Sequence, residues 1–338
     1  MGLVKYMGKN KAIILDDDDW YSIEKKILTK HFGAEEAKKL LEEENEPKSK
    51  QKKKVKKENA VEKKSAVNTG KMKIIISRKG FDVANGGIAS PIMPDGSLLS
   101  FPIPSKDKKT FSDLVFNGKD YKKLIDELKP GTKLHNCHID PDIRKSAHKK
   151  LPSNWKPVFG QCDAAESHLE NQGVKVNDLF LFFGWFKKTE EVNGAYRYQR
   201  GAKDLHVLYG YLQIGKIVQG KDVLQYPWHP HSYVAPSNTM YVASEKLVID
   251  GVDTGLPGAG VFKFSDDLVL TYPGMSKSRW KLPEFFKEVT ISCHTKDSFK
   301  PEGYFQSVPI GQEFVVSESP KVTEWAKKII MENVDLGR

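Results

Sequence analysis

Cysteine is scarce in this sequence, and long apolar runs are missing from it. Only Cys137, Cys162 and Cys293 occur among 338 residues, and no two of them form a CxxC pair. Three cysteines exclude a disulfide framework, so a reducing, cytoplasmic compartment is expected. No apolar run approaches the roughly 18–20 residues that cross a bilayer, so no membrane partner is expected.

Four familiar catalytic signatures are also missing. The sequence contains no GxxxxGK[ST], no GxSxG, no HExxH and no convincing GxGxxG after a strand. Each signature places a defined group, such as a phosphate-binding loop or a nucleophile, in a defined turn. Their absence excludes the usual nucleotide hydrolase, dinucleotide-binding, serine hydrolase and zincin interpretations.

Charge, by contrast, is abundant and mostly positive. The formal net charge is +10, which favours an acidic partner such as a nucleotide or nucleic acid. Residues 1–72 contain 18 lysines and 13 acidic residues, whereas the rest contains 36 basic and 31 acidic residues. Half of the excess therefore belongs to the first fifth of the chain, and the remainder is only mildly basic.

The chain is predicted to have three parts. Residues 1–46 carry apolar positions at helical spacing over 20–44, which predicts a short helical extension able to dock a protein partner. Residues 47–71 are rich in lysine and poor in apolar residues, which predicts a disordered linker. The linker is either a solvated tether or one that also binds nucleic acid through Lys52, Lys53, Lys54, Lys56 and Lys57. Residues 72–338 form the functional domain.

This domain is predicted to be α+β. Strands are expected where Val, Ile, Phe and Tyr concentrate, at 73–77, 98–103, 179–186, 205–218, 239–243, 261–264, 268–271 and 312–316. Helices are expected at 119–128, 163–172, 281–287 and 321–332. Because the strands do not alternate with long helices, we predict a mixed, largely antiparallel sheet or a partly closed barrel with peripheral helices.

The first candidate site is the stretch ISRKGFDVANGGIASPIMPDGS at 76–97. Arg78 and Asp82 follow an apolar strand, and Gly86 and Gly87 allow a backbone to approach a ligand closely. Arg78 is suited to phosphate or carboxylate through its planar fork. The other interpretation is an ordered loop in which Asp95 opens a Pro-Asp-Gly turn.

The second candidate site is LHNCHIDPDIRK at 134–145. If this segment is extended, His138 and Asp140 project to one face, where they can transfer protons. Arg144 adds a positive charge that can contact substrate. The alternative is a histidine hydrogen-bonded to a turn.

The third candidate group begins a helix at VFGQCDAAE. Asp163 fits either a catalytic carboxylate or a helix cap. Gln161 precedes it and can hydrogen-bond a base. Further along, Trp185, His206 and Tyr211 are candidates for a base-stacking pocket, with core packing as the alternative.

The segment YPWHPHSYV at 226–234 contributes His229 and His231, which project to one side. Two histidines plus a carboxylate such as Asp140 would make a non-haem iron triad. Nothing in the sequence places that carboxylate beside them, so substrate contact is the preferred interpretation. We therefore predict no metal ligands from the sequence, and the cofactor stays open.

These segments, in this order, resemble the nucleotide modification associated domain 3 family over about residues 72–312. The shared motifs are ISRKGFD…GG…SPIMPDGSLLSFPIP, HIDPD, FGQCDAAESHLENQGV, DLFLFFGWF, LHVLYGYLQIGKI and HPHSYV…NTMYVAS. The resemblance implies an α+β domain in a nucleic-acid base modification setting. It implies site residues at the matching positions: Arg78, Asp82, Asp95, His138, Asp140, Asp163 and His229.

Two functions follow as alternatives. One is an enzyme that modifies a nucleotide or a base within nucleic acid, DNA rather than RNA, through a pocket of His, Asp and Arg. The other is a reader of modified bases without turnover, with Trp185 and Tyr211 as stacking walls. The strand pair NDLFLFF and GYLQIGKI is similar to that of PUA-like barrels, which would suit a reader.

Overall fold

The computed structural model describes residues 4–6, 12–14, 72–308 and 311–336 and divides into two units, 1–65 and 66–338. In the first unit, strand β1 (Val4–Tyr6) pairs antiparallel with β2 (Ala12–Ile14). The helix expected at 20–44 and the linker at 47–71 with its five lysines lie outside the described residues. The second unit holds all the other elements.

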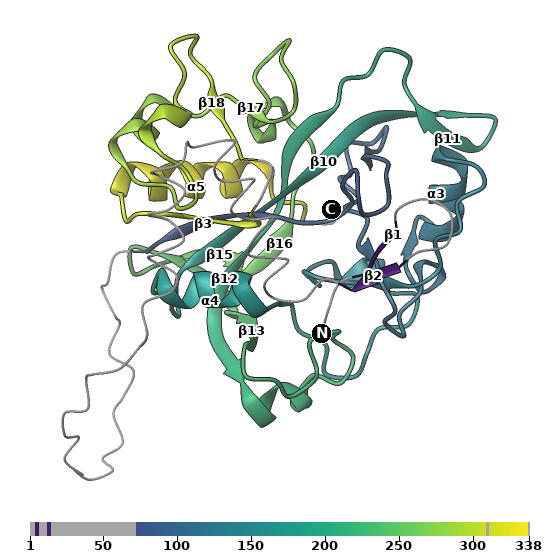
Figure 1. Ribbon diagram of the computed structural model, residues 1–338, viewed down its shortest axis with the longest axis horizontal. Coiled ribbons are helices and arrows are strands. Elements are labelled where there is room, and N and C mark those ends of the chain that lie inside the picture. Colours follow the sequence, from purple (N-terminus) through teal and green to yellow (C-terminus); the bar gives the residue numbers. More distant parts are fainter. Residues whose placement is uncertain (1–3, 7–11, 15–71, 309–310, 337–338) are drawn as a thin grey trace. The chain divides into compact units, whose positions relative to one another are not determined.

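A nine-stranded sheet is the centre of the second unit (Figure 1). Its two longest strands, β10 (Leu179–Val192) and β12 (Leu205–Gln219), pair antiparallel. Residues 179–184 of β10 are buried on both faces, as expected of a central strand made of continuous Leu and Phe. The other members are β3 (Ile74–Arg78), β4 (Ser90–Ile92), β9 (Val158–Cys162), β11 (Ala195–Tyr198), β13 (Asn238–Ala243), β16 (Ala259–Val261) and β19 (Glu313–Val316).

The strand order along the sheet is β19-β3-β10-β12-β13-β9. β10 is parallel to β3 and β4, and every other pair in the sheet is antiparallel. The edge strands β9 and β19 do not pair, so the sheet is open. The predicted α+β class with a mixed, largely antiparallel sheet is confirmed, and the sheet does not close into a barrel.

Three α-helices lie around the sheet in the described part of the second unit. α3 (Tyr121–Leu128) contacts β11, and α5 (Pro320–Asn333) contacts β3 (Figure 1). α4 (Asp163–Asn171) contacts both edge strands, β9 and β19. It therefore bridges the two edges of the sheet that do not pair with each other.

Some predicted elements differ from the observed ones. The segment 98–103 is not one strand: Leu98 forms a single bridge with Ile92, and the rest is irregular up to β5 (Ile103–Pro104), where Pro102 and Pro104 lack backbone donors. Residues 268–271 hold no strand, and the expected helix at 281–287 is a 3-10 turn, Glu284–Glu288, after Pro283. Short two-stranded sheets surround the main one: β5 with β8 (Cys137–His138), β6 (Val115–Phe116) with β7 (Lys119–Asp120), β14 (Lys246–Ile249) with β15 (Val252–Pro257), and β17 (Arg279–Trp280) with β18 (Phe305–Gln306).

Buried apolar side chains of the described residues form three clusters, and two of them are large. The larger one follows β3, β10 and β12 and continues under α5. The smaller one gathers Phe81, Phe101, Phe111 and Tyr121 around α3, and it includes Cys137 and Ile139. The segment that carries the second candidate site therefore lines the smaller core.

The loop after β3 is an ordered turn. Oδ1 of Asp82 accepts hydrogen bonds from the backbone N–H of Ala84 (2.7 Å) and Asn85 (2.6 Å). Gly86 has φ +92°, and a Cβ there would overlap the ring of Phe81. This glycine is thus required by the turn itself.

No helix among the described residues is long and apolar enough to cross a membrane.

Candidate functional site

Four segments that are distant in the sequence meet at one cluster of polar side chains. They are the loop containing Asp107, the end of β8 with His138 and Asp140, Gly160 on β9, and residues 229–238 before and at the start of β13. Cys137 and Ile139 point into the smaller core, so the alternate residues His138 and Asp140 point away from it. The predicted common face of His138 and Asp140 follows from this alternation.

His138 is held from behind by Asp107. Its Nδ1 lies 2.7 Å from Oδ2 of Asp107, and that oxygen also accepts from Oγ of Ser105 (2.8 Å). The amide of Asn136 donates to the carbonyl of Asp107 (2.6 Å), which fixes the loop. With Nδ1 directed to a carboxylate, Nε2 is the atom that His138 presents to the cluster.

His231 is held in the same way by Asn238. Its Nδ1 lies 2.7 Å from Oδ1 of Asn238, whose amide nitrogen donates to the carbonyls of His231 (2.8 Å) and Tyr233 (2.7 Å). Burial lowers the pKa of His231 to about 4, against the opposing field of Asp140, so the imidazole is neutral at neutral pH. Its Nε2 faces the cluster.

Asp140 is anchored through one oxygen. Oδ1 accepts from the backbone N–H of Gly160 (2.7 Å) and lies 3.4 Å from Nε2 of His229. Nδ1 of His229 in turn accepts from the backbone N–H of His231 (3.3 Å). Burial raises the pKa of Asp140, but the hydrogen bond from His229 and the fields of the three histidines outweigh it and lower the pKa to about 2.

The remaining atoms of these three residues converge. Nε2 of His138 lies 3.2 Å from Nε2 of His231, and Oδ2 of Asp140 lies 3.9 Å from the latter. One ligand atom from each residue lies within 4.8 Å of the others. Three electron-pair donors, each anchored at its other end, therefore point at one place.

The cluster is open on one side. The side chain of His138 is 23% exposed, whereas those of His231 and Asp140 are buried. Tyr233 is exposed and stacks on the ring of His231 with centroids 6.0 Å apart. Lys106 and Lys108, which flank Asp107, lie at the surface as well. Of the three residues, His138 is thus the one whose side chain solvent reaches.

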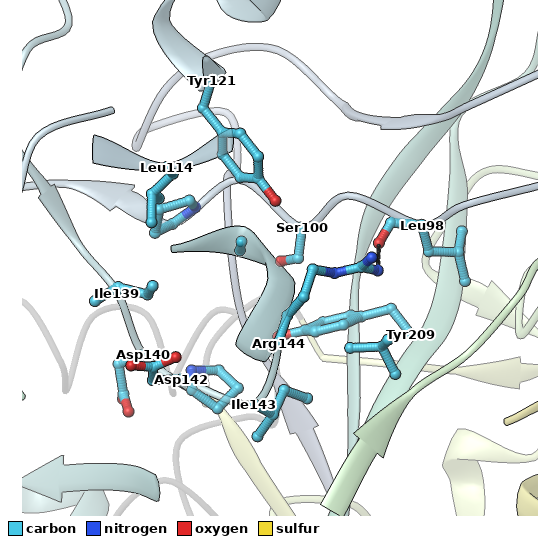
Figure 2. A pocket seen from close by; sticks show the side chains of 14 residues that line it. Leu98, Ser100, Leu114, Tyr121, Ile139, Asp140, Asp142, Ile143, Arg144 and Tyr209 are labelled. Atoms are coloured by element: carbon cyan, nitrogen blue, oxygen red, sulfur yellow. Dashed lines mark hydrogen bonds between the residues drawn. The ribbon is translucent and has the colours of Figure 1, made fainter. Parts of the chain in front are cut away.

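Asp140 also lines a small cavity (Figure 2). Its volume is about 50 Å³, well below the roughly 300 Å³ of a small-molecule site. Arg144 crosses it and donates to the carbonyl of Leu98 (2.7 Å), as the dashed line in Figure 2 shows. Tyr209 and Ile143 line it as well. This space is large enough for water molecules and too small for a nucleobase. Arg144 therefore binds the backbone of Leu98 here and not a substrate.

The family model for nucleotide modification associated domain 3 matches residues 73–317. The match covers most of the chain and every segment of the cluster. The chain belongs to this family. No curated protein and no solved structure matches it. The nucleotide modification associated domain thus has its His–Asp cluster inside the matched range, and the matched family connects the chain with nucleotide modification.

Several predicted site residues of the nucleotide modification associated domain contact other parts of the fold. Arg78 donates through Nη2 to the carbonyl of Val308 (2.6 Å) and lies over the ring of Phe314. Asp82 and Asp95 accept from the backbones of their own turns, and Gly87 has φ +69° in the first of these turns. None of these contacts joins His138 or Asp140.

Asp163 and Gln161 lie on the α4 side of the sheet. Asp163 is the first residue of α4, with Cys162 at the cap position. It has φ +55° and its backbone N–H donates to the carbonyl of Ser237 (3.0 Å). The amide of Gln161 donates to Oε1 of Glu313 on the opposite edge strand (2.8 Å). Gln161 is therefore part of the link between the two sheet edges.

Trp185, His206 and Tyr211 lie on β10 and β12, and none of them lines the cavity in Figure 2. Tyr211 is fully buried and donates to the carbonyl of Pro257 (2.8 Å). His206 is buried, and its Nδ1 accepts from Nε1 of Trp280 (2.9 Å). Nε1 of Trp185 donates to Asp204 (2.8 Å). Each ring has a partner within the domain.

Three residues of the cluster had no sequence signal or only a weak one. Asp107 lies in a lysine-rich loop, Asn238 begins a strand, and Gly160 is a strand glycine. Only Gly160 offers a hint, because a glycine inside a strand indicates close approach of another group. That group is the ring of His231, which a Cβ at position 160 would overlap.

We expect the Gly160→Ala variant to lose the function that depends on this cluster. The new methyl group would push His231 away, and the backbone donor to Asp140 would shift with it. Gly194→Ala is the matched control for a glycine replacement outside the cluster, because a Cβ there meets nothing within 4 Å. Because Gly194 has a φ of +78°, an alanine there strains the backbone more than an alanine at position 160 does. Full function in Gly160→Ala would show that His231 is not needed where it stands.

Glu166 on α4 gives a pH-dependent prediction. Burial raises its pKa to about 7, and the hydrogen bonds from Thr239 and Tyr241 only partly offset this. Between about pH 4.5 and 7 the folded state holds a proton that the unfolded state has lost, so stability falls as pH rises through this window. We expect Glu166→Gln to raise the melting temperature at about pH 8 and to lose this advantage near pH 5. Exposed Glu170→Gln, one turn later, should show neither effect.

Proposed function

We propose that this protein is an enzyme that modifies a nucleotide, or a base within nucleic acid, at the cluster of His138, Asp140 and His231. One observation carries the proposal: three electron-pair donors converge at an accessible point, and each is fixed from behind by its own hydrogen bond. In a cluster with a purely structural role, hydrogen-bond donors of the protein would point at these three acceptor atoms. The family membership adds the setting of nucleotide modification.

The cluster has the parts that acid–base or electrophilic chemistry needs. The Asp107 carboxylate behind His138 orients the ring and stabilises a positive charge on it. Asp140 stays ionised and His231 stays neutral at neutral pH. The converging lone pairs can therefore receive a proton from substrate or hold a cation that polarises it.

The surroundings suit a nucleotide. Lys106 and Lys108 place two positive charges beside the loop that orients His138, where phosphates would bind. The exposed ring of Tyr233 offers a face for a base, next to His231. We propose DNA as the first nucleic acid to test, with free nucleotides and RNA as the comparison substrates.

The two lysines give a direct prediction. Lys106→Gln with Lys108→Gln should weaken binding of a single-stranded oligonucleotide and reduce its salt slope by about 0.7 for each phosphate that is no longer neutralised. Fluorescence anisotropy at several salt concentrations measures both. The surface pair Lys281→Gln with Lys296→Gln serves as the charge-matched control. An equal reduction in both double variants would mean that only net charge matters.

The test of activity is mass spectrometry of nucleosides from DNA, RNA and the free pool, in cells with and without the protein. A nucleoside that changes with the wild type and not with His138→Ala supports the enzyme. His135→Ala, an exposed histidine of the same segment, is the control. Binding of a modified oligonucleotide without any nucleoside change would instead support a reader.

A further inference from the structure

We propose that His138, Asp140 and His231 bind one divalent first-row transition-metal ion. The inference deepens the function proposed above, because it names the cofactor of the same site. It rests on the direction of the hydrogen bonds around the cluster and on the spacing of the three donor atoms.

The protonation of the two imidazoles follows from their partners. The amide nitrogen of Asn238 donates to two carbonyls, so its oxygen must be the atom that faces Nδ1 of His231. Nδ1 of His231 therefore carries the hydrogen, and Nε2 carries a lone pair. Asp107 imposes the same tautomer on His138, because a carboxylate accepts and does not donate.

Two nitrogen lone pairs at 3.2 Å repel each other unless a positive charge lies between them. Oδ2 of the Asp140 carboxylate is a third electron-pair donor directed at the same place. Two imidazole nitrogens bound to one ion at about 2.0–2.1 Å are about 2.9 Å apart at a right angle and about 3.4 Å apart at a tetrahedral angle. The observed 3.2 Å lies between these values. Oδ2 of Asp140 lies 3.9 Å from Nε2 of His231, so the carboxylate has to move toward the ion to complete the set.

The neighbours of these atoms form a typical outer shell. Ligating histidines usually donate their other N–H to a carboxylate or carbonyl, as His138 does to Asp107 and His231 does to Asn238. The other oxygen of Asp140 is occupied by Gly160. His229 is not counted as a ligand: its Nδ1 accepts from a backbone N–H, and its Nε2 lies 3.4 Å from Oδ1 of Asp140, the oxygen that Gly160 holds.

The donor set selects the class of ion. Two imidazoles and one carboxylate suit Zn²⁺, Fe²⁺ and Co²⁺, whereas Mg²⁺ prefers oxygen ligands and keeps its water. Three protein ligands leave coordination positions free, as in catalytic sites and unlike closed structural ones. Because the side chain of His138 is partly exposed, a water molecule or a substrate oxygen could reach an ion held by these residues.

The experiment uses full-length protein without a polyhistidine tag, stripped of metal by a chelator. Co²⁺ is added as a spectroscopic probe, and Zn²⁺ binding is followed by calorimetry. We expect one equivalent of each ion to bind, and Mg²⁺ to bind far more weakly. His138→Ala, His231→Ala and Asp140→Asn should lose the cobalt spectrum, while His135→Ala should keep it.

Asp107→Asn tests the outer shell without removing a ligand. It should weaken Zn²⁺ binding by about 10–100-fold and keep the stoichiometry. Circular dichroism of each variant confirms that it is folded. The proposal is overturned if the wild type binds no equivalent of Co²⁺ or Zn²⁺, or if the three ligand variants bind like the wild type. A proton shared between the two imidazoles would then explain the short distance between them.

The proposed metal site and the proposed activity can be disproved independently of each other. Stoichiometric metal with no nucleoside change in cells would leave the metal site standing and remove the proposed activity. A nucleoside change that survives in metal-free protein assayed in vitro would leave the proposed activity standing and show that it does not depend on the metal ion.

Discussion

His138→Ala and Asp140→Asn should abolish nucleotide modification while changing the melting temperature by only a few degrees. The side chain of His138 is 23% exposed, so its removal opens no core cavity and loses one hydrogen bond, worth about 1 kcal/mol. Asparagine at 140 keeps the oxygen that accepts from Gly160 and removes the negative charge. Both changes also relieve the repulsion among the three facing acceptors. Nucleoside mass spectrometry and thermal melting of the same variants give the two readouts.

A matched pair of variants separates site from scaffold. His148 is buried, and its Nε2 lies 2.8 Å from Asp142, two residues after Asp140. His148→Ala should therefore lower stability by more than His138→Ala does, since it leaves a buried carboxylate with one partner fewer. If His138→Ala melts far below the wild type and yet keeps full activity, His138 is a structural residue and the proposed centre is wrong.

The largest effect on stability is expected at the buried ion pair of Lys79 and Glu313. Nζ of Lys79 lies 2.7 Å from Oε1 of Glu313, and the two side chains are only 7% and 1% exposed. Removing one partner leaves a buried charge, so Glu313→Ala should lower the free energy of unfolding by about 3–5 kcal/mol. Gln161 loses the nearer of its two acceptors in the same variant and keeps Oε1 of Gln312 at 3.4 Å. The melting temperature should fall by on the order of 10 °C.

The double variant Lys79→Met with Glu313→Met should recover most of this stability, because an apolar pair of similar volume leaves no unpaired charge. The exposed pair of Lys321 and Glu288 is the control, and Glu288→Ala should change stability by less than about 1 kcal/mol. Chemical denaturation of the wild type and these variants measures each free energy of unfolding. A double variant as unstable as Glu313→Ala would show that packing, and not the unpaired charge, causes the destabilisation.

The central strands could be predicted from the sequence because their apolar residues are continuous. Leu179–Phe183 and the middle of β12 have no other way to bury both faces. The edges were harder to predict. β9 contains a glycine, a glutamine and a cysteine among five residues, and its pairing with β13 depends on a partner about 80 residues away. Local pattern carries no information about such pairing.

The candidate site was predictable to the extent that it obeys local geometry. His138 and Asp140 follow the alternation of an extended segment. His229 and His231 lie in a turn, so the extended conformation expected for them is wrong, although both rings lie near Asp140. The outer partners Asp107 and Asn238 are brought in by the fold. The charged residues after β3 were equally conspicuous in the sequence, yet Lys79 and Arg78 are used to join that strand end to the C-terminal segment. A conspicuous charge indicates a partner and does not say whether the partner is a ligand.

The assembly of the cluster from four distant segments has a consequence for the abundance of the protein. The unfolded chain cannot bring Asp107, His138, Gly160 and His231 together, so any ion or substrate that binds there binds only the folded state. At one hundred times its dissociation constant such a ligand adds about 2.7 kcal/mol to stability. Cells short of that ligand would therefore hold less folded protein, because quality control removes the unfolded fraction. Supply of the ligand would set the level of the protein as well as its activity.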